Sequence, residues 1–303
     1  MPSLTDALVA GPVVLDGGLS TELEAAGHDV SSALWSARLL RDDPDAIVAA
    51  HAAFAAAGAQ VATTASYQAT FDGFAAAGID RAETARLITS SVALARRGAP
   101  EGWIAGSVGP YGAMLADGSE YTGDYVDAVG VRELRAFHRP RMELLAGAGA
   151  DVLACETVPA AAEAEALIAE AQALGVPIWL SLTTVTGDDG VVRTRRGERA
   201  ADVFALTAGI DEVLAVGVNC TDPAGAGPAV EAAARSGKPV AIYPNSGEVW
   251  DAVGRRWTGS AGIDVDVVPG WTAAGAWLVG GCCRVRPQHI ERIASSIRFP
   301  GLA

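Results

Sequence analysis

The sequence is poor in lysine and in basic clusters. Lys238 is the single lysine, and the 22 lysine and arginine residues together are outnumbered by 36 acidic residues, which gives a net charge of −14. Binding to nucleic acid depends on clustered positive charge, and so does attraction to an anionic membrane surface. We therefore expect neither nucleic acid nor a membrane as a partner.

Long apolar runs and abundant cysteines are also missing. The longest apolar stretch, residues 46–59, is too short to cross a bilayer and contains His51. The run at residues 7–15 has no basic residue before it and is interrupted by Gly11 and Pro12, so it favours a first strand over a signal peptide. Four cysteines in 303 residues do not form the disulfide framework of a secreted protein. These features predict a cytoplasmic protein with reduced thiols.

Short apolar runs, rather than alternating ones, recur along the whole chain, as is typical of parallel strands buried on both faces. No linker or low-complexity segment divides them, so residues 1–303 are expected to form one domain. The expected strands are residues 12–16, 60–64, 103–107, 151–155, 178–182, 213–218, 239–243 and 276–279.

Alanine-rich helical segments lie between these runs, and several end at a glycine such as Gly58, Gly98 or Gly175. Eight βα-like units predict a single (β/α)₈ barrel, with a doubly wound parallel sheet as the alternative. The expected helices are residues 45–57, 82–97, 131–146, 159–174 (with Pro159 in the first turn), 198–207, 228–236 and 287–297.

Polar and sulfur-containing residues follow several of the expected strands. In a (β/α)₈ barrel the active site lies where strands end and loops begin. Asp16 or Glu156 at such a place can bind a ligand, although Asp16 could instead cap a turn and Glu156 could balance an arginine. The candidate residues at the strand ends are Asp16, Gly17, Gly18, Tyr67, Glu156, Asn219, Cys220, Cys282 and Cys283.

Three of the four cysteines fall at the ends of two strands that a single neighbour separates in a barrel. Cys220 and the adjacent pair Cys282 and Cys283 could therefore share a metal ion. Three thiolates with an open fourth position match the ligand pattern of catalytic zinc. Free cysteines also often fill space in a core, and placement alone leaves both interpretations open. Cys155, inside an expected strand, is expected to be such a packing residue.

Seven segments together resemble the homocysteine S-methyltransferase family: VLDGGLSTELE, TTASYQATFDGF, GSVGPYGAMLADGSEYTGDY, LACETVP, GVNC, YPNSGEVW and GGCCR. The resemblance runs nearly end to end. The YPNSGEVW and GSEYTGDY segments are similar to the stand-alone members that use S-methylmethionine or S-adenosylmethionine as the methyl donor. The resemblance as a whole implies an enzyme on a (β/α)₈ barrel that methylates the thiol of L-homocysteine to form methionine.

The resemblance also implies roles for individual residues. Cys220, Cys282 and Cys283 correspond to the cysteines that hold the family's zinc, and Asp16 and Glu156 to the carboxylates that bind the amino group of homocysteine. Tyr67 corresponds to a tyrosine that approaches the metal in some members when substrate is absent.

Further expectations concern the surroundings of these residues. The backbone N–H groups around Gly17 and Gly18 are hypothesised to meet the substrate carboxylate, and Asn219 is expected in the substrate site. The loops at residues 110–125 and 244–259 are candidates to cover the donor, or else are ordinary packing.

Two other functions compete with this interpretation. The cysteines could form a non-catalytic structural zinc site or a redox-sensing thiol cluster, although structural zinc sites usually have four protein ligands. A zinc-dependent hydrolase would typically use histidine or carboxylate ligands, which the order of these motifs does not offer.

Overall fold

The structure is a computed structural model that describes residues 2–30, 34–251, 256–259 and 263–298. Its centre is an eight-stranded sheet in the order β1-β12-β9-β8-β5-β4-β3-β2, and the neighbouring strands are parallel. The strands are β1 (Val13–Val14), β2 (Val61–Thr63), β3 (Trp103–Val108), β4 (Val152–Val158), β5 (Ile178–Leu182), β8 (Val213–Asn219), β9 (Val240–Tyr243) and β12 (Ala276–Val279).

The two edge strands of this sheet, β1 and β2, meet and close it into a barrel. The backbone N–H of Gln60 donates to the carbonyl oxygen of Val14 at 2.8 Å. The side-chain oxygen of the same glutamine accepts a hydrogen bond from the Val14 N–H at 3.0 Å. The expected (β/α)₈ barrel is therefore confirmed, and the doubly wound alternative is wrong because such a sheet stays open.

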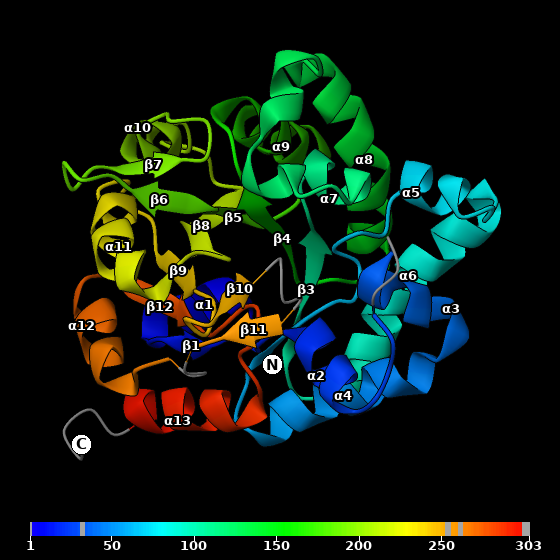
Figure 1. The fold of residues 1–303 in the computed structure, drawn as a ribbon, viewed down its shortest axis with the longest axis horizontal. Helices are drawn as coiled ribbons and strands as arrows, with labels where there is room; N and C mark the ends of the chain where they lie inside the picture. The colour runs from blue at the N-terminus through cyan, green and yellow to red at the C-terminus, as the bar shows by residue number, and fades with distance from the viewer. Residues whose placement is uncertain (1, 31–33, 252–255, 260–262, 299–303) are drawn as a thin grey trace.

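Helices surround the strands, and α1 lies at one end of the barrel (Figure 1). The helices are α1 (Leu4–Ala10), α2 (Leu19–Ala25), α3 (Leu39–Asp42), α4 (Pro44–Ala56), α5 (Phe71–Ala76), α6 (Arg81–Gly98), α7 (Tyr111–Leu115), α8 (Val131–Gly147), α9 (Ala161–Leu174), α10 (Ala200–Ala205), α11 (Ala226–Ala234), α12 (Val268–Ala273) and α13 (Pro287–Arg298). Two antiparallel hairpins, β6 (Thr184–Thr186) with β7 (Val192–Thr194) and β10 (Val249–Asp251) with β11 (Arg256–Thr258), extend from the loops. Within the described ranges, no helix is both long and apolar enough to cross a membrane.

Helix α1 covers the amino end of the barrel. Its buried residues Leu4 and Leu8 pack in one cluster with Val61, Trp103 and Val152, the first residues of β2, β3 and β4. This apolar layer closes one end of the barrel, so the polar groups are left to the opposite, carboxyl end.

Some expected boundaries were wrong. The apolar run at residues 7–15 does not form one strand: its first part belongs to α1, which begins with a Ser3–Asp6 capping box, and β1 contains only Val13–Val14. Helix α9 begins at Ala161, so Pro159 precedes the helix instead of lying in its first turn. Strand β4 continues to Val158, which places Glu156 inside the strand.

Candidate metal and substrate site

A cavity opens at the carboxyl end of the barrel, where the active sites of (β/α)₈ enzymes lie. Its lining includes no Lys, Arg or His from the part of the chain that the structure describes. The nine residues that the sequence analysis placed at a site all line this cavity: Asp16, Gly17, Gly18, Tyr67, Glu156, Asn219, Cys220, Cys282 and Cys283.

The sulfur atoms of Cys220, Cys282 and Cys283 converge at this cavity. The Sγ atom of Cys220 lies 3.0 Å from that of Cys282 and 3.5 Å from that of Cys283, and all three lie within 4.8 Å of one another. Sulfurs bound at about 2.3 Å to one tetrahedral ion would be about 3.8 Å apart. The three side chains therefore need to move by less than about 1 Å to share a metal ion.

Local backbone geometry brings these sulfurs together. Cys220 directly follows β8 with a φ of 49°, in the left-handed region that residues other than glycine rarely adopt. Gly281 precedes the cysteine pair, and a Cβ atom there would overlap the side chain of Val285. Such backbone strain is characteristic of functional sites, where the surrounding structure maintains it.

The protonation of the three thiols also fits a cation. Hydrogen bonds from Cys220 and Cys282 hold the pKa of Cys283 well below its usual range. The hydrogen bond between Cys282 and Cys220 raises the pKa of Cys282 well above the ordinary value. The hydrogen bonds within the cluster favour one thiolate beside two thiols, and a bound cation would favour deprotonation of all three.

Two buried carboxylates face the same cavity. Burial raises the pKa of Asp16 from 3.8 to about 7, and burial likewise raises that of Glu156 from 4.5 to about 7. Asp16 accepts hydrogen bonds from the backbone N–H and the hydroxyl of Thr63, and Glu156 accepts one from the hydroxyl of Ser107. Since these partners are neutral, a cationic ligand would stabilise the charged form of both carboxylates.

Asn219 and Gly18 use their polar groups within the protein. The side-chain amide of Asn219 accepts from the Thr157 N–H at 2.7 Å and donates to the Thr157 hydroxyl at 2.8 Å. The Gly18 N–H donates to the carbonyl oxygen of Val285 at 2.9 Å. The hypothesis that N–H groups around Gly17 and Gly18 meet a substrate carboxylate stays a prediction. Asn219 holds Thr157, the residue that follows Glu156.

Tyr121, which the sequence analysis did not single out, contacts the cysteine cluster. Tyr121 belongs to the short 3₁₀ helix η2 (Ser119–Tyr121). Its hydroxyl oxygen lies 3.5 Å from the Cys220 Sγ atom. Tyr67 also lines the cavity, with its ring against Gly109, where a Cβ atom would have no room. The signal for Tyr121 was its position in the loop at residues 110–125, one of the two expected to cover a donor. Residues 252–255 of the other loop lie outside the described residues.

Comparison with known proteins identifies the family of this chain. The family model described as homocysteine S-methyltransferase matches residues 13–297. The chain belongs to the homocysteine S-methyltransferase family.

Relatives of this homocysteine S-methyltransferase family member match along nearly their whole length. This chain is 45% identical over 297 residues to Homocysteine S-methyltransferase of Escherichia coli, and the match covers 93% of this chain and 94% of the relative. It is 41% identical over 304 residues to Homocysteine S-methyltransferase YbgG of Bacillus subtilis, covering 94% of each. The crystal structure of the E. coli homocysteine methyltransferase MmuM in its metallated form superposes with a TM-score of 0.83 at 42% identity, covering 94% of this chain and 96% of that one.

Proposed function

We propose that this protein transfers a methyl group from a sulfonium donor, S-methylmethionine or S-adenosylmethionine, to the thiol of L-homocysteine and so forms methionine. We propose further that it does so with Zn²⁺ held by Cys220, Cys282 and Cys283. The observation that carries the proposal is the convergence of three sulfurs, at 3.0 and 3.5 Å, on a cavity that also contains two buried carboxylates.

The cysteine cluster supports zinc as the metal. Thiolate sulfur is a soft ligand, and it favours zinc over the hard cations Mg²⁺ and Ca²⁺. Bound to three thiolates, Zn²⁺ would supply the Lewis acidity that keeps a substrate thiol deprotonated near neutral pH. The hydroxyl of Tyr121, beside Cys220, is placed to donate a hydrogen bond to its sulfur.

Asp16 and Glu156 would bind the ammonium group of homocysteine. Both are buried and carry a raised pKa, so an ammonium ion would replace the hydration that their charged forms lose on burial. Thr63 fixes the Asp16 carboxylate through two hydrogen bonds of 2.7 and 2.8 Å, which orients it before substrate arrives. The amino acid would then be held with its side chain directed toward the cysteines.

The reaction places few chemical demands on the protein. The methyl carbon forms a bond to the homocysteine sulfur as its bond to the sulfonium sulfur breaks, and the departing sulfur keeps the bonding pair. The leaving group is a neutral thioether, so it needs no proton from a general acid. Holding the two sulfur atoms in line with the methyl carbon is therefore the main contribution of the site.

The cavity also suits a cationic donor. Tyr67 and Tyr121 line it, and aromatic faces attract sulfonium as they attract other cations. The carboxyl groups of Asp16 and Glu156 also line the cavity, and their charged forms would attract a cation. Free, closely spaced thiols suit a reducing compartment, which supports a cytoplasmic site of action.

The non-catalytic alternatives fit the site less well. A structural zinc site usually has four protein ligands, whereas the cluster found among the described residues contains three. A cluster that only senses oxidation gives no role to the two carboxylates in the same cavity.

Product formation tests the proposal. Purified protein loaded with Zn²⁺ is incubated with L-homocysteine and one methyl donor: S-methylmethionine, S-adenosylmethionine, betaine or methylated folate. The methionine formed is measured by mass spectrometry. We expect methionine from S-methylmethionine or S-adenosylmethionine, its loss after chelation, and its recovery when Zn²⁺ is restored. Turnover with betaine or methylated folate alone, or full turnover after chelation, would contradict the proposal.

A further inference from the structure

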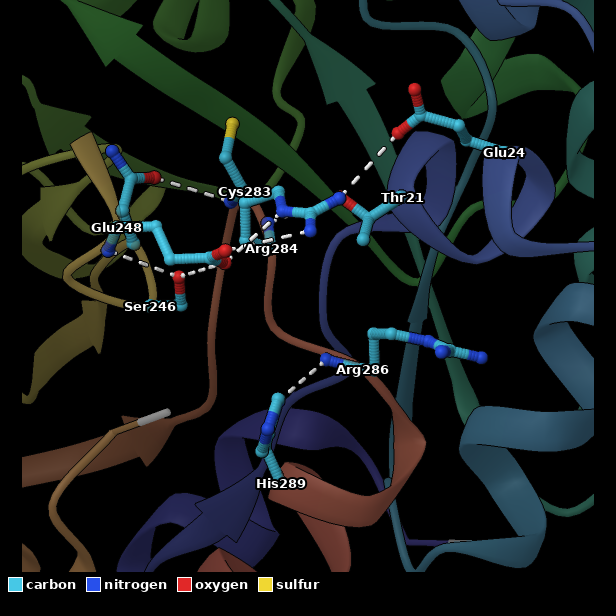
Figure 2. A network of polar contacts seen from close by, with 9 residues as sticks. Thr21, Glu24, Ser246, Glu248, Cys283, Arg284, Arg286 and His289 are labelled. Carbon is cyan, nitrogen blue, oxygen red and sulfur yellow. Dashed lines mark hydrogen bonds and ion pairs between the residues drawn. The ribbon is translucent and has the colours of Figure 1, made fainter. Parts of the chain in front are cut away.

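Arg284 directly follows the cysteine pair and connects three separate segments of the chain. Its Nε atom lies 3.1 Å from Oε2 of Glu248, in the loop after β9, and its Nη2 atom lies 3.5 Å from Oε1 of the same residue. Its Nη1 atom lies 3.6 Å from Oε2 of Glu24 in α2. Figure 2 shows the guanidinium group between these two carboxylates. One side chain thus joins the turn after β12 to two neighbouring segments.

The backbone at Arg284 has a conformation that it would not adopt without support. The Val285 N–H donates to the Cys282 carbonyl oxygen at 3.1 Å and closes a four-residue turn, in which Arg284 has a φ of 67°. Glycine or asparagine normally occupies such a position in a turn. The Arg284 N–H donates to the Thr21 hydroxyl at 3.0 Å, which anchors the turn to α2.

The loop that contains Glu248 is in turn bonded to the backbone of Cys283. The Ser246 N–H donates to the Cys283 carbonyl oxygen at 3.0 Å, and the Cys283 N–H donates to Oδ1 of Asn245 at 3.1 Å. The Ser246 hydroxyl donates to Oε2 of Glu248 at 3.0 Å, so the carboxylate that binds Arg284 also fixes this loop. The Glu248 side chain is only 9% exposed, which limits its screening by water.

We propose that Arg284 is a positioning residue for the metal site, which acts by pairing with Glu248 and Glu24. The pairing holds the turn at Cys282 and Cys283 in its strained form and keeps the Cys283 sulfur toward Cys220. Arg284 would act on the sulfur cluster through the backbone of this turn. This inference rests on the proposed function, because it assumes that the cysteines bind zinc.

Electrostatics and positioning predict opposite results for loss of this arginine. Removing a positive charge near a bound dication should tighten metal binding if only the charge matters. Removing a group that orients a ligand typically weakens metal binding by about 10- to 100-fold. The sign of the change therefore separates the two roles.

Arg286 is a matched control two residues further along the same segment. Its Nε atom lies 3.0 Å from Oε2 of Glu22, so it also pairs with α2. Its side chain points away from Glu248 in Figure 2. Arg286→Gln removes the same charge as Arg284→Gln without breaking the connection between the loop after β9 and the cysteine turn.

The test measures the zinc dissociation constant of the full chain by competition with a chromophoric chelator. We expect Arg284→Gln and Glu248→Gln each to weaken zinc binding about 10- to 100-fold, and Arg286→Gln to leave it within about twofold. Urea unfolding of the metal-free variants checks that Arg284→Gln and Arg286→Gln remain folded to a similar extent. An unchanged or tighter dissociation constant in Arg284→Gln, or an equal loss in Arg286→Gln, would overturn the proposal.

A second measurement does not depend on zinc. The rate at which maleimide labels Cys283 in the metal-free protein, located by mass spectrometry, reports how firmly the turn is held. We expect faster labelling in Arg284→Gln than in Arg286→Gln, and equal rates would count against positioning. If the unaltered protein binds no zinc, the proposed function fails, and the labelling rates alone decide the role of Arg284.

Discussion

Cys155 and Cys220 show how two regions of one barrel use the same residue type differently. Both are buried, Cys155 in the middle of β4 and Cys220 directly after β8. Cys155 packs in the apolar layer between the sheet and the helices, where burial raises the pKa of its thiol. Cys220 turns into the cavity beside two other thiols. Burial alone therefore does not distinguish a structural cysteine from one that binds a ligand.

The side to which each strand residue points explains the difference. Consecutive strand residues point to opposite faces, so Ala154 lies in the cluster inside the barrel and Cys155 in the layer outside it. Glu156, the next residue, faces the cavity again. We call the cavity at the carboxyl end the mouth. We call the buried layer outside the strands, both between strands and helices and among the helices, the shell. Polar groups in the shell are expected to affect stability, and those at the mouth to affect ligand binding.

Alanine at each of the two cysteines gives the largest expected contrast. Cys220→Ala removes one of three metal ligands, so bound zinc, measured by elemental analysis, should fall from about one ion per chain to a small fraction of that, and methionine formation with it. Cys155→Ala should keep its bound zinc and its methionine formation, and it should lower the free energy of unfolding by about 1 kcal/mol. Loss of zinc in Cys155→Ala, or retention of zinc and turnover in Cys220→Ala, would break the comparison.

Two buried carboxylates offer the next contrast. Glu156 at the mouth has neutral partners, and Glu156→Gln should weaken homocysteine binding, measured by calorimetry, by about 10- to 100-fold because a charge-assisted hydrogen bond is lost. Glu163 in the shell accepts hydrogen bonds from the Tyr125 hydroxyl and, at 2.7 Å, from the Tyr111 N–H, and it pairs with His138. Glu163→Gln should mainly lower the unfolding free energy. An unchanged homocysteine affinity in Glu156→Gln would remove this residue from the site.

A buried histidine in the shell predicts a smaller, pH-dependent effect. Burial lowers the pKa of His51 from 6.5 to about 4, so at pH 5 the unfolded chain binds a proton that the folded chain does not. The contribution of His51 is therefore fully present above about pH 6.5 and decreases as the pH falls toward 4. We expect the unfolding free energy, measured by urea titration, to fall between pH 7 and pH 5. The fall should be about 2 kcal/mol larger in the unaltered protein than in the His51→Gln variant. Parallel losses in the two proteins would show that His51 does not titrate in this way.

The sequence predicted most of the barrel because its signals are local. The strands at residues 178–182 and 276–279 have the expected bounds, since continuous apolar runs between turn residues leave few alternatives. The first strand was expected at residues 12–16 and contains only Val13–Val14, and the part of the apolar run before Gly11 belongs to a helix. The capping pair Ser3 and Asp6 was the signal that would have identified that helix.

The site was predicted only where its residues lie at strand ends. The carboxyl ends of parallel strands meet at one end of a barrel, so Asp16, Glu156 and Cys220 could be expected together. Tyr121 and Arg284 depend on contacts between distant segments, such as the approach of the loop after β9 to the cysteine turn. No periodicity or spacing encodes those contacts, and they became visible only in the folded chain.

The junction of β1 with β2 has a consequence beyond completing the fold. Gln60 bridges these strands with its backbone and its side chain, and Asp16 reaches across the same junction to Thr63. A bound amino acid that contacts Asp16 would strengthen the link between β1 and β2. Ligand binding would then raise the free energy needed to separate these two strands.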